Sequence, residues 1–244
     1  PWRSDRSEPG SASASFRLRR PRASAGFGGN GGPAVPRETI LHRVRTALGR
    51  AAGEDPEPAP PPRLCIPETG IDRRVSSFCA ALESLAGSAT VVHTADEARQ
   101  TVAALLAGHT AVASNAPFLA ELGISSLPGV QCGILDRDEL KRACAAADFG
   151  ITSADYALAD TGSLVMISSR QEPRLISLLP PRHIAVVPRE RILANLDELF
   201  VLIPLPSQLS SSLVLITGPS RTADIEQILV RGVHGPGHVH AIIL

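Results

Sequence analysis

The first elements that the hydrophobic pattern predicts are two amphipathic helices. Apolar residues recur every three or four positions in both segments, which places them on one side of a helix. These positions are Ile40, Leu41, Val44 and Leu48 in the first segment and Ile71, Val75, Phe78, Leu82 and Leu85 in the second. Gly49 marks the end of the first helix. A proline-rich stretch at residues 51–63 lies between the two segments and predicts a linker.

From residue 89 onward, short apolar runs of strand length alternate with stretches of helical periodicity. The predicted strands cover residues 89–92, 110–114, 131–135, 183–187, 213–217 and the C-terminal end. The predicted helices cover residues 94–106, 116–122, 137–147, 174–178, 189–199 and 222–230. This alternation predicts an α/β fold of three layers, in which a mixed, mostly parallel sheet has helices on both faces.

A hairpin is predicted in the middle of the chain. Two β-like runs, residues 156–159 and 163–168, flank the tripeptide Asp160-Thr161-Gly162. Asp and Gly are typical turn residues, and the flanking runs are short enough for two antiparallel strands. The hairpin is the reason for expecting a mixed sheet.

The N-terminal quarter differs in composition from the rest. The first 62 residues contain ten of the 21 prolines and eight of the 20 glycines. We therefore predict a disordered N-terminal extension at residues 1–36 and a folded domain at residues 37–244. The basic run at residues 17–22 is also compatible with a nucleic-acid or targeting arm, but its composition favours a solvated, disordered segment.

Charge and cysteine content exclude several classes of function. The chain has 24 basic and 24 acidic residues, which does not favour nucleic acid or an anionic membrane as a partner. Its apolar runs are too short for a membrane span. The four cysteines, Cys65, Cys79, Cys132 and Cys144, lack the spacing of a zinc or iron–sulfur site. We expect reduced thiols, a cytoplasmic location and no metal or cofactor in this chain.

Four stretches together resemble the lactate utilisation protein C branch of the LUD domain family. They are residues 150–155 (GITSAD) running into 159–164 (ADTGSL), 174–183 (RLISLLPPRH), 217–226 (TGPSRTADIE) and 232–236 (GVHGP). The resemblance covers residue 37 to the end. The sequence departs from the family at Asp160, where Glu is more frequent, and at Ser163, where Thr is. The side chain of Asp160 is one methylene group shorter than that of Glu, which argues against a role that needs the longer side chain.

The resemblance implies a fold and a function. The fold of the family is similar to that of sugar-phosphate isomerases, coenzyme A transferases and formyltetrahydrofolate cyclo-ligases. Its members look like non-redox components of a system that oxidises L-lactate to pyruvate. Partner proteins of that system carry iron–sulfur clusters, which agrees with the absence of a cysteine motif in this chain. The resemblance does not imply that this chain is catalytic by itself.

Two residues are candidates for catalysis. Asp160 lies beside the Thr161-Gly162 turn, where a carboxylate can act as a base or nucleophile if its surroundings raise its pKa, and Asp155 lies at the other end of the same strand. The alternative is that Asp160 is a turn residue bonded to its own backbone. His234 is interpreted as a loop residue near a pocket. A metal site that includes His238 and His240 is not favoured, because a Gly-Pro-Gly sequence separates His234 from them.

Further residues are candidates for ligand binding. Ser220, Arg221 and Thr222 lie between a predicted strand and a predicted helix, where backbone N–H groups, hydroxyls and a guanidinium can hold a phosphate or carboxylate. Thr161 and Gly162 of the turn belong to the same set. Arg174 and His183 border the LLPP sequence and can bind a carboxylate and transfer a proton. The alternatives are a helix cap at Thr222, an exposed Arg174 and a His183 that only begins a strand.

The sequence is therefore compatible with three functions. The first is the lactate-oxidation component just described. The second is an independent enzyme acting on a small anion such as a phosphosugar, a folate or an acyl-CoA, which predicts one pocket lined by Asp160, Ser220, Arg221 and His234. The third is a scaffold or interaction protein, which predicts an exposed apolar patch.

Overall fold

The computed structural model describes residues 36–49, 63–203, 212–222 and 230–244. The chain separates into two compact units, residues 1–61 and residues 62–244. The predicted N-terminal extension and linker lie outside the described residues, apart from Pro36 and Arg63. In the first unit, helix α1 covers Arg37–Ala47 and confirms the first predicted helix. Ile40 and Val44 are exposed, Leu41 is half-buried, and the helix has no buried residue.

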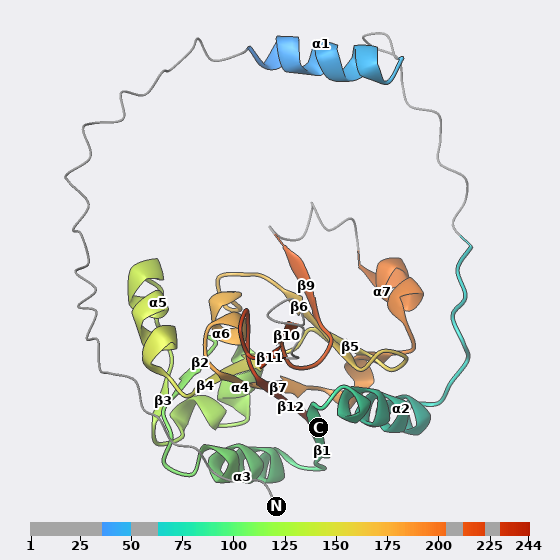
Figure 1. Cartoon of the computed structure of the whole chain (residues 1–244). Helices are drawn as coiled ribbons and strands as arrows, with labels where there is room; N and C mark the ends of the chain where they lie inside the picture. Colours follow the sequence, from blue (N-terminus) through green and yellow to red (C-terminus); the bar gives the residue numbers. More distant parts are fainter. Residues whose placement is uncertain (1–35, 50–62, 204–211, 223–229) are drawn as a thin grey trace, which may run out of the picture. The chain divides into compact units, whose positions relative to one another are not determined.

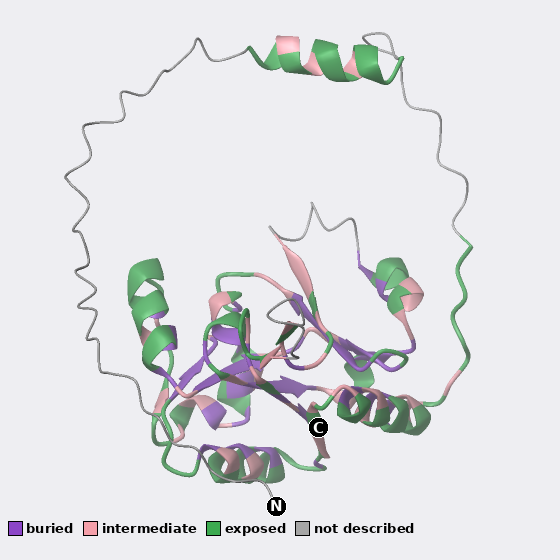
Figure 2. Cartoon of the chain, in the orientation of Figure 1, coloured by how far each residue is buried: buried purple, intermediate pink, exposed green. Residues whose placement is uncertain are grey.

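The centre of the second unit is a six-stranded sheet in which every pairing is parallel (Figure 1). In order across the sheet the strands are β1 (Ser88–Val91), β12 (His238–Ile243), β7 (Arg182–Val187), β4 (Phe149–Ser153), β2 (Ala111–Ala113) and β3 (Val130–Gln131). Buried apolar residues fill the inner strands (Figure 2). The predicted α/β fold with a mostly parallel sheet is confirmed.

A second, four-stranded sheet contains the predicted hairpin. Its order is β8 (Ile192–Leu193), β5 (Tyr156–Leu158), β6 (Ser163–Ile167) and β9 (Leu213–Ile216). β5 pairs with β6 in the antiparallel sense, which confirms the hairpin. β8 pairs with β5 in the parallel sense, whereas β9 pairs with β6 in the antiparallel sense. The mixed pairing that the sequence predicted is therefore found in this second sheet.

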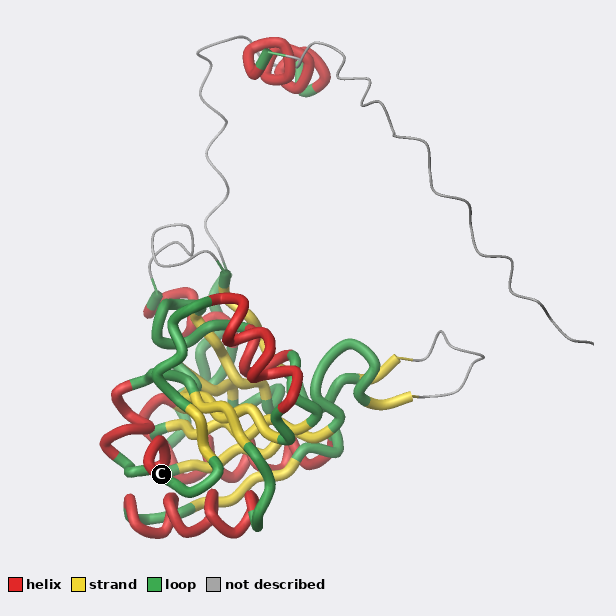
Figure 3. The backbone as a smooth tube through the Cα atoms, turned by 90° about the vertical axis from the view of Figure 1, so that its left-hand side faces the viewer, coloured by secondary structure: helices red, strands yellow, loops and turns green. Residues whose placement is uncertain are grey.

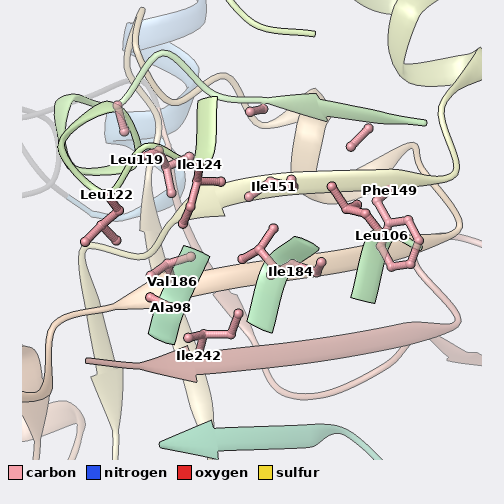
Figure 4. Packing of buried hydrophobic residues seen from close by; sticks show 14 of the residues in the cluster. Ala98, Leu106, Leu119, Leu122, Ile124, Phe149, Ile151, Ile184, Val186 and Ile242 are labelled. Atoms are coloured by element: carbon pink, nitrogen blue, oxygen red, sulfur yellow. The ribbon is translucent and has the colours of Figure 1, made fainter. Parts of the chain in front are cut away.

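Helices cover both faces of the main sheet. The α-helices of the second unit are α2 (Ile71–Ser84), α3 (Ala95–Leu106), α4 (Pro117–Glu121), α5 (Arg137–Ala146), α6 (Leu175–Leu178) and α7 (Leu196–Leu202). On one face, α3, α4 and the 3₁₀ helix η1 (Ile124–Ser126) pack on Ile151, Ile184 and Ile242 (Figure 4). On the other face lie α2, α5, α6 and the second sheet. Most strands lie between helices, whereas the short β-ribbon on the right projects from the rest (Figure 3).

Three predicted elements differ from the structure. Residues 189–199 form a 3₁₀ turn, η2 (Arg189–Arg191), followed by β8 and α7, because the apolar pair Ile192–Leu193 pairs with β5. The helix predicted at residues 222–230 is wrong at its ends, since Arg221–Thr222 (β10) pairs with Val230–Arg231 (β11), and residues 223–229 lie outside the described residues. The strand predicted at residues 131–135 is limited to β3.

The short β3 has a local cause. Beyond Gln131, the side chain of Asn115 replaces a neighbouring strand as the hydrogen-bonding partner of the backbone. Its Oδ1 accepts from the N–H of Gly133 at 2.6 Å, and its Nδ2 donates to the carbonyl of Ile134 at 3.4 Å. The apolar residues after β3 therefore do not continue the sheet.

The contact between α6 and β4 is unusually close because β4 has a glycine at this point. A Cβ atom added to Gly150 would lie 1.9 Å from the carbonyl oxygen of Ile176 in α6. A Cβ and a carbonyl oxygen cannot lie that close together, so any side chain at this position would force the helix to move. Gly150 therefore sets how near α6 lies to the sheet.

Gly150→Ala should destabilise the second unit by about 3 kcal/mol or more, because α6 must move away from β4. Gly70→Ala is the matched control, since a Cβ at Gly70 would meet no atom within 4 Å. At this helix N-cap position the control should cost less than about 1 kcal/mol. Urea unfolding of both variants measures the difference, and equal free energies of unfolding would contradict the proposed role of Gly150.

Candidate functional site

Three of the four stretches that resemble the LUD domain family meet at one cavity of about 220 Å³. The first of the three contributes Arg174 and the residues of α6 that follow it, the second contributes Thr217 to Ser220, and the third contributes His234 to Pro236. Its lining residues are Arg174, Ser177, Leu178, Val214, Leu215, Ile216, Thr217, Gly218, Ser220, His234, Gly235, Pro236 and Val239. The structure thus brings together Arg174, Ser220 and His234 from the predicted ligand-binding and catalytic residues.

Backbone hydrogen bonds hold the three stretches against each other. The N–H of Ser220 donates to the carbonyl of Pro236 at 2.8 Å, and the N–H of Gly232 donates to the carbonyl of Ser220 at 3.0 Å. The N–H of Gly237 donates to the carbonyl of Pro181 at 2.9 Å. The walls of the cavity are therefore fixed by main-chain contacts between segments that are distant in the sequence.

The chemistry of the lining favours an anion. Arg174 carries the only formal charge among the lining residues, which include no carboxylate. Its guanidinium forms no hydrogen bond or ion pair with the residues that the structure describes. The hydroxyls of Thr217 and Ser220 and the exposed imidazole of His234 add further hydrogen-bonding groups. A guanidinium beside hydroxyls is a suitable site for a carboxylate or phosphate.

The turn residues lie beside this cavity, but they are not part of its lining. A chain of hydroxyls links the turn to the wall: Thr161 Oγ1 lies 2.8 Å from Ser163 Oγ, which lies 2.7 Å from Thr217 Oγ1. Asp160 is exposed, and its side chain forms no hydrogen bond with the described residues. Gly162 has a φ of 66°, and a Cβ there would lie 2.4 Å from the backbone nitrogen of Leu82. Gly162 thus has a packing role against α2.

The remaining predicted residues lie elsewhere. His183 is buried in β7, where its Nε2 lies 2.8 Å from Thr152 Oγ1. Burial lowers the pKa of His183 to about 4, so the imidazole is neutral at pH 7. Arg221 and Thr222 belong to β10 and do not line the 220 Å³ cavity. Thr222 is in a strand and is therefore not the first residue of the expected helix, and residues 223–229, which would follow Thr222 as a helix cap, lie outside the described residues.

The single pocket expected for an independent enzyme is only partly formed. Ser220 and His234 line the cavity, whereas Asp160 and Arg221 do not. No group of three or more His, Cys, Asp and Glu residues in the described ranges is arranged to hold a metal ion. In the same ranges, no helix combines the length and apolar character needed to cross a membrane.

Sequence reasoning missed a buried carboxyl group, Glu172. Its Oε1 accepts from Ser114 Oγ at 2.7 Å and from the backbone N–H of Ser153 at 2.8 Å, and its Oε2 is buried without a partner among the described residues. Burial raises the pKa of Glu172 to about 7. The residue lies in a short polar segment without periodicity, so the sequence carries no signal of its burial.

A family model and similar proteins of known sequence both relate this chain to the LUD domain family. The sequence model of the LUD domain matches residues 75–244. The chain is 32% identical over 222 residues to "Lactate utilization protein C" of Halalkalibacterium halodurans, covering 82% of this chain and 94% of that protein. It is 30% identical over 221 residues to the protein of the same name from Anoxybacillus flavithermus, covering 85% and 98%.

One solved structure has a similar fold. It is the crystal structure of a DUF162 family protein from Deinococcus radiodurans, with a TM-score of 0.55 and 20% sequence identity. The match covers 72% of this chain and 98% of that chain. The similarity supports the α/β fold described above.

Glu172 should make the stability of the second unit depend on pH. Its pKa is raised from 4.5 to about 7, so it stabilises the fold below pH 4.5, and this contribution is lost as the pH rises through 7. Glu172→Gln removes the cost of burying the charge, but the NH₂ group of the new amide takes the place of the unpartnered Oε2. We expect the variant to be more stable than the parent by about 1–2 kcal/mol at pH 8, and no more stable at pH 4. A pH series of urea unfolding tests this; a pH-independent difference would contradict it.

Proposed function

The chain belongs to the LUD domain family, and we propose that it acts in lactate utilisation as a non-redox component that binds a small carboxylate. Two relatives that match over most of their length are named lactate utilization protein C, which supports this role. The observation that carries the proposal is the 220 Å³ cavity with one guanidinium and no carboxylate in its lining.

The dimensions and groups of the cavity suit lactate or pyruvate. The carboxylate of either acid would pair with the guanidinium of Arg174, which offers two parallel N–H donors. The hydroxyl or keto oxygen would face Ser220 and His234, and the methyl group would contact apolar lining residues such as Val239. A larger phosphosugar, folate or acyl-CoA would extend beyond a cavity of this volume.

Electron transfer is assigned to partner proteins. Oxidation of lactate to pyruvate removes the equivalent of a hydride and a proton from the substrate. In our proposal, iron–sulfur clusters in partner proteins accept the electrons, while this chain, in the cytoplasm, holds and orients the acid. The family resemblance, together with the dispersed positions of the four cysteines in the sequence, supports this division.

The scaffold alternative has one observation in its favour. Helix α7 exposes apolar side chains, among them Phe200 at 50%, Val201 at 57% and Leu202 at 53%. Exposed apolar groups of this kind are typical of a protein contact surface. They are compatible with a component that binds both a ligand and a partner, and the assays below separate ligand binding from scaffolding.

Replacing Arg174 should weaken the binding of L-lactate and pyruvate. Arg174→Gln removes the only cation of the lining, so we expect the dissociation constant to rise about tenfold or more. Arg170→Gln is the matched control, because Arg170 is also exposed and lies four residues earlier but does not line this cavity. Isothermal titration calorimetry gives both constants. Equal affinities of the two variants would remove the support for this site.

Lactate-dependent dye reduction tests whether this chain binds the acid while partner proteins transfer the electrons. The purified chain is assayed alone and after mixing with candidate iron–sulfur lactate-oxidation proteins. We expect activity only in the mixture, and lower activity when the mixture contains Arg174→Gln instead of the parent chain. No complex and no activity in either sample would refute the accessory role and favour an independent enzyme. Full activity with Arg174→Gln would favour a scaffold.

A further inference from the structure

A second cavity, of about 500 Å³, lies at the carboxyl edge of the main sheet. Strands β2 and β4 are neighbours there, and the chain leaves them toward opposite faces. After β2 it enters α4, whose Leu119 packs with Ala111 and Ala113. After β4 it enters the second sheet, which packs on the other face. In α/β proteins, ligands bind where neighbouring strands diverge in this way.

The charges of this cavity are the opposite of those in the first. Glu121, Asp155 and Glu172 line it, and Arg191 is the only basic lining residue. Arg191 is exposed, and its guanidinium already donates to the backbone carbonyl of Asp155 at 3.4 Å. Its charge lowers the pKa of Asp155, but by less than burial raises it.

The two inner carboxyl groups are held by the ends of the strands. Glu172 accepts hydrogen bonds from Ser114 and Ser153, and it is only 8% exposed, with Oε2 unpartnered in the described part of the chain. Asp155 Oδ2 accepts from the N–H of Ile167 at 2.7 Å. Burial raises the pKa of both residues, and the charge of Asp155 raises that of Glu172 further. The positive charge around the two groups therefore does not offset their burial.

We propose that the carboxyl-edge cavity is a second ligand site, which takes a small molecule bearing a primary ammonium group next to Asp155 and releases a proton from Glu172 when it binds. The ammonium group supplies the positive charge that the two carboxyl groups lack. The charge of the ammonium group lowers the pKa of Glu172 from a distance, so the ligand need not contact the buried Oε2. A carboxylate is disfavoured here because it adds a third anion beside Asp155 and Glu172. The site is separate from the Arg174 cavity and independent of the proposed function.

Isothermal titration calorimetry with ethylammonium, ethylene glycol and acetate tests the site. Runs at pH 7 in two buffers of different ionisation enthalpy count the protons exchanged. Because the pKa of Glu172 is about 7, ethylammonium should bind with release of roughly half a proton. Its affinity should be higher at pH 8 than at pH 6. Ethylene glycol should bind more weakly, and acetate should not bind in this cavity.

Two variants and one control make the test specific. Asp155→Asn should weaken ethylammonium binding about tenfold or more. Glu172→Gln should retain binding but exchange no proton. Asp138→Asn, at an exposed residue of α5, should behave as the parent chain does. The proposal is overturned if ethylammonium does not bind, if both cavity variants bind like the parent, or if the parent releases no proton.

Discussion

The close contact between α6 and β4 at Gly150 determines where the polar groups of this protein lie. It allows the carbonyl of Ile176 to approach the sheet and so fixes the short segment that precedes α6. That segment borders two cavities: Glu172 lines one at the carboxyl ends of the strands, and Arg174 lines the other beside β9 and β12. A side chain at position 150 would displace both residues together.

The two cavities differ in charge and therefore in the ligands that they favour. The smaller has a guanidinium and hydroxyls without a carboxylate, which suits a small acid. The larger has carboxyl groups with one screened guanidinium, which suits a cation. Only Pro173 lies between Glu172 and Arg174, so one short segment carries both the buried carboxyl group and the guanidinium of the other cavity. Two cavities of different charge therefore border one segment of the chain.

Much of the fold was predictable from the sequence because burial in a sheet leaves a clear pattern. The second halves of β7 (residues 184–187) and β12 (residues 241–243) are continuous apolar runs, as expected for strands covered on both faces. The β5–β6 hairpin was predictable from its Asp-Thr-Gly turn. The short β8 was not, because Ile192 and Leu193 lie in a stretch whose apolar spacing also fits a helix and only pairing with β5 decides. The separation into two sheets depends on such long-range pairing.

The candidate site was predictable only where a motif marked it. Arg174, Ser220 and His234 were selected for their side-chain chemistry within stretches that resemble the family, and they meet at one cavity, although nothing in their spacing shows that they are close. His183 was selected in the same way, but burial holds it neutral beside Thr152. Glu172 escaped selection because its segment of the sequence is polar and without periodicity, and its hydrogen-bond partners, Ser114 just after β2 and Ser153 at the end of β4, are distant in the sequence.

The central claim is that the Arg174 cavity binds a small carboxylate. A crystal structure of the protein with pyruvate tests it most directly. We expect bound pyruvate to pair its carboxylate with the Arg174 guanidinium and to direct its keto oxygen toward Ser220 or His234. A pyruvate bound elsewhere, or an Arg174 cavity that remains empty at saturating pyruvate, would contradict the claim.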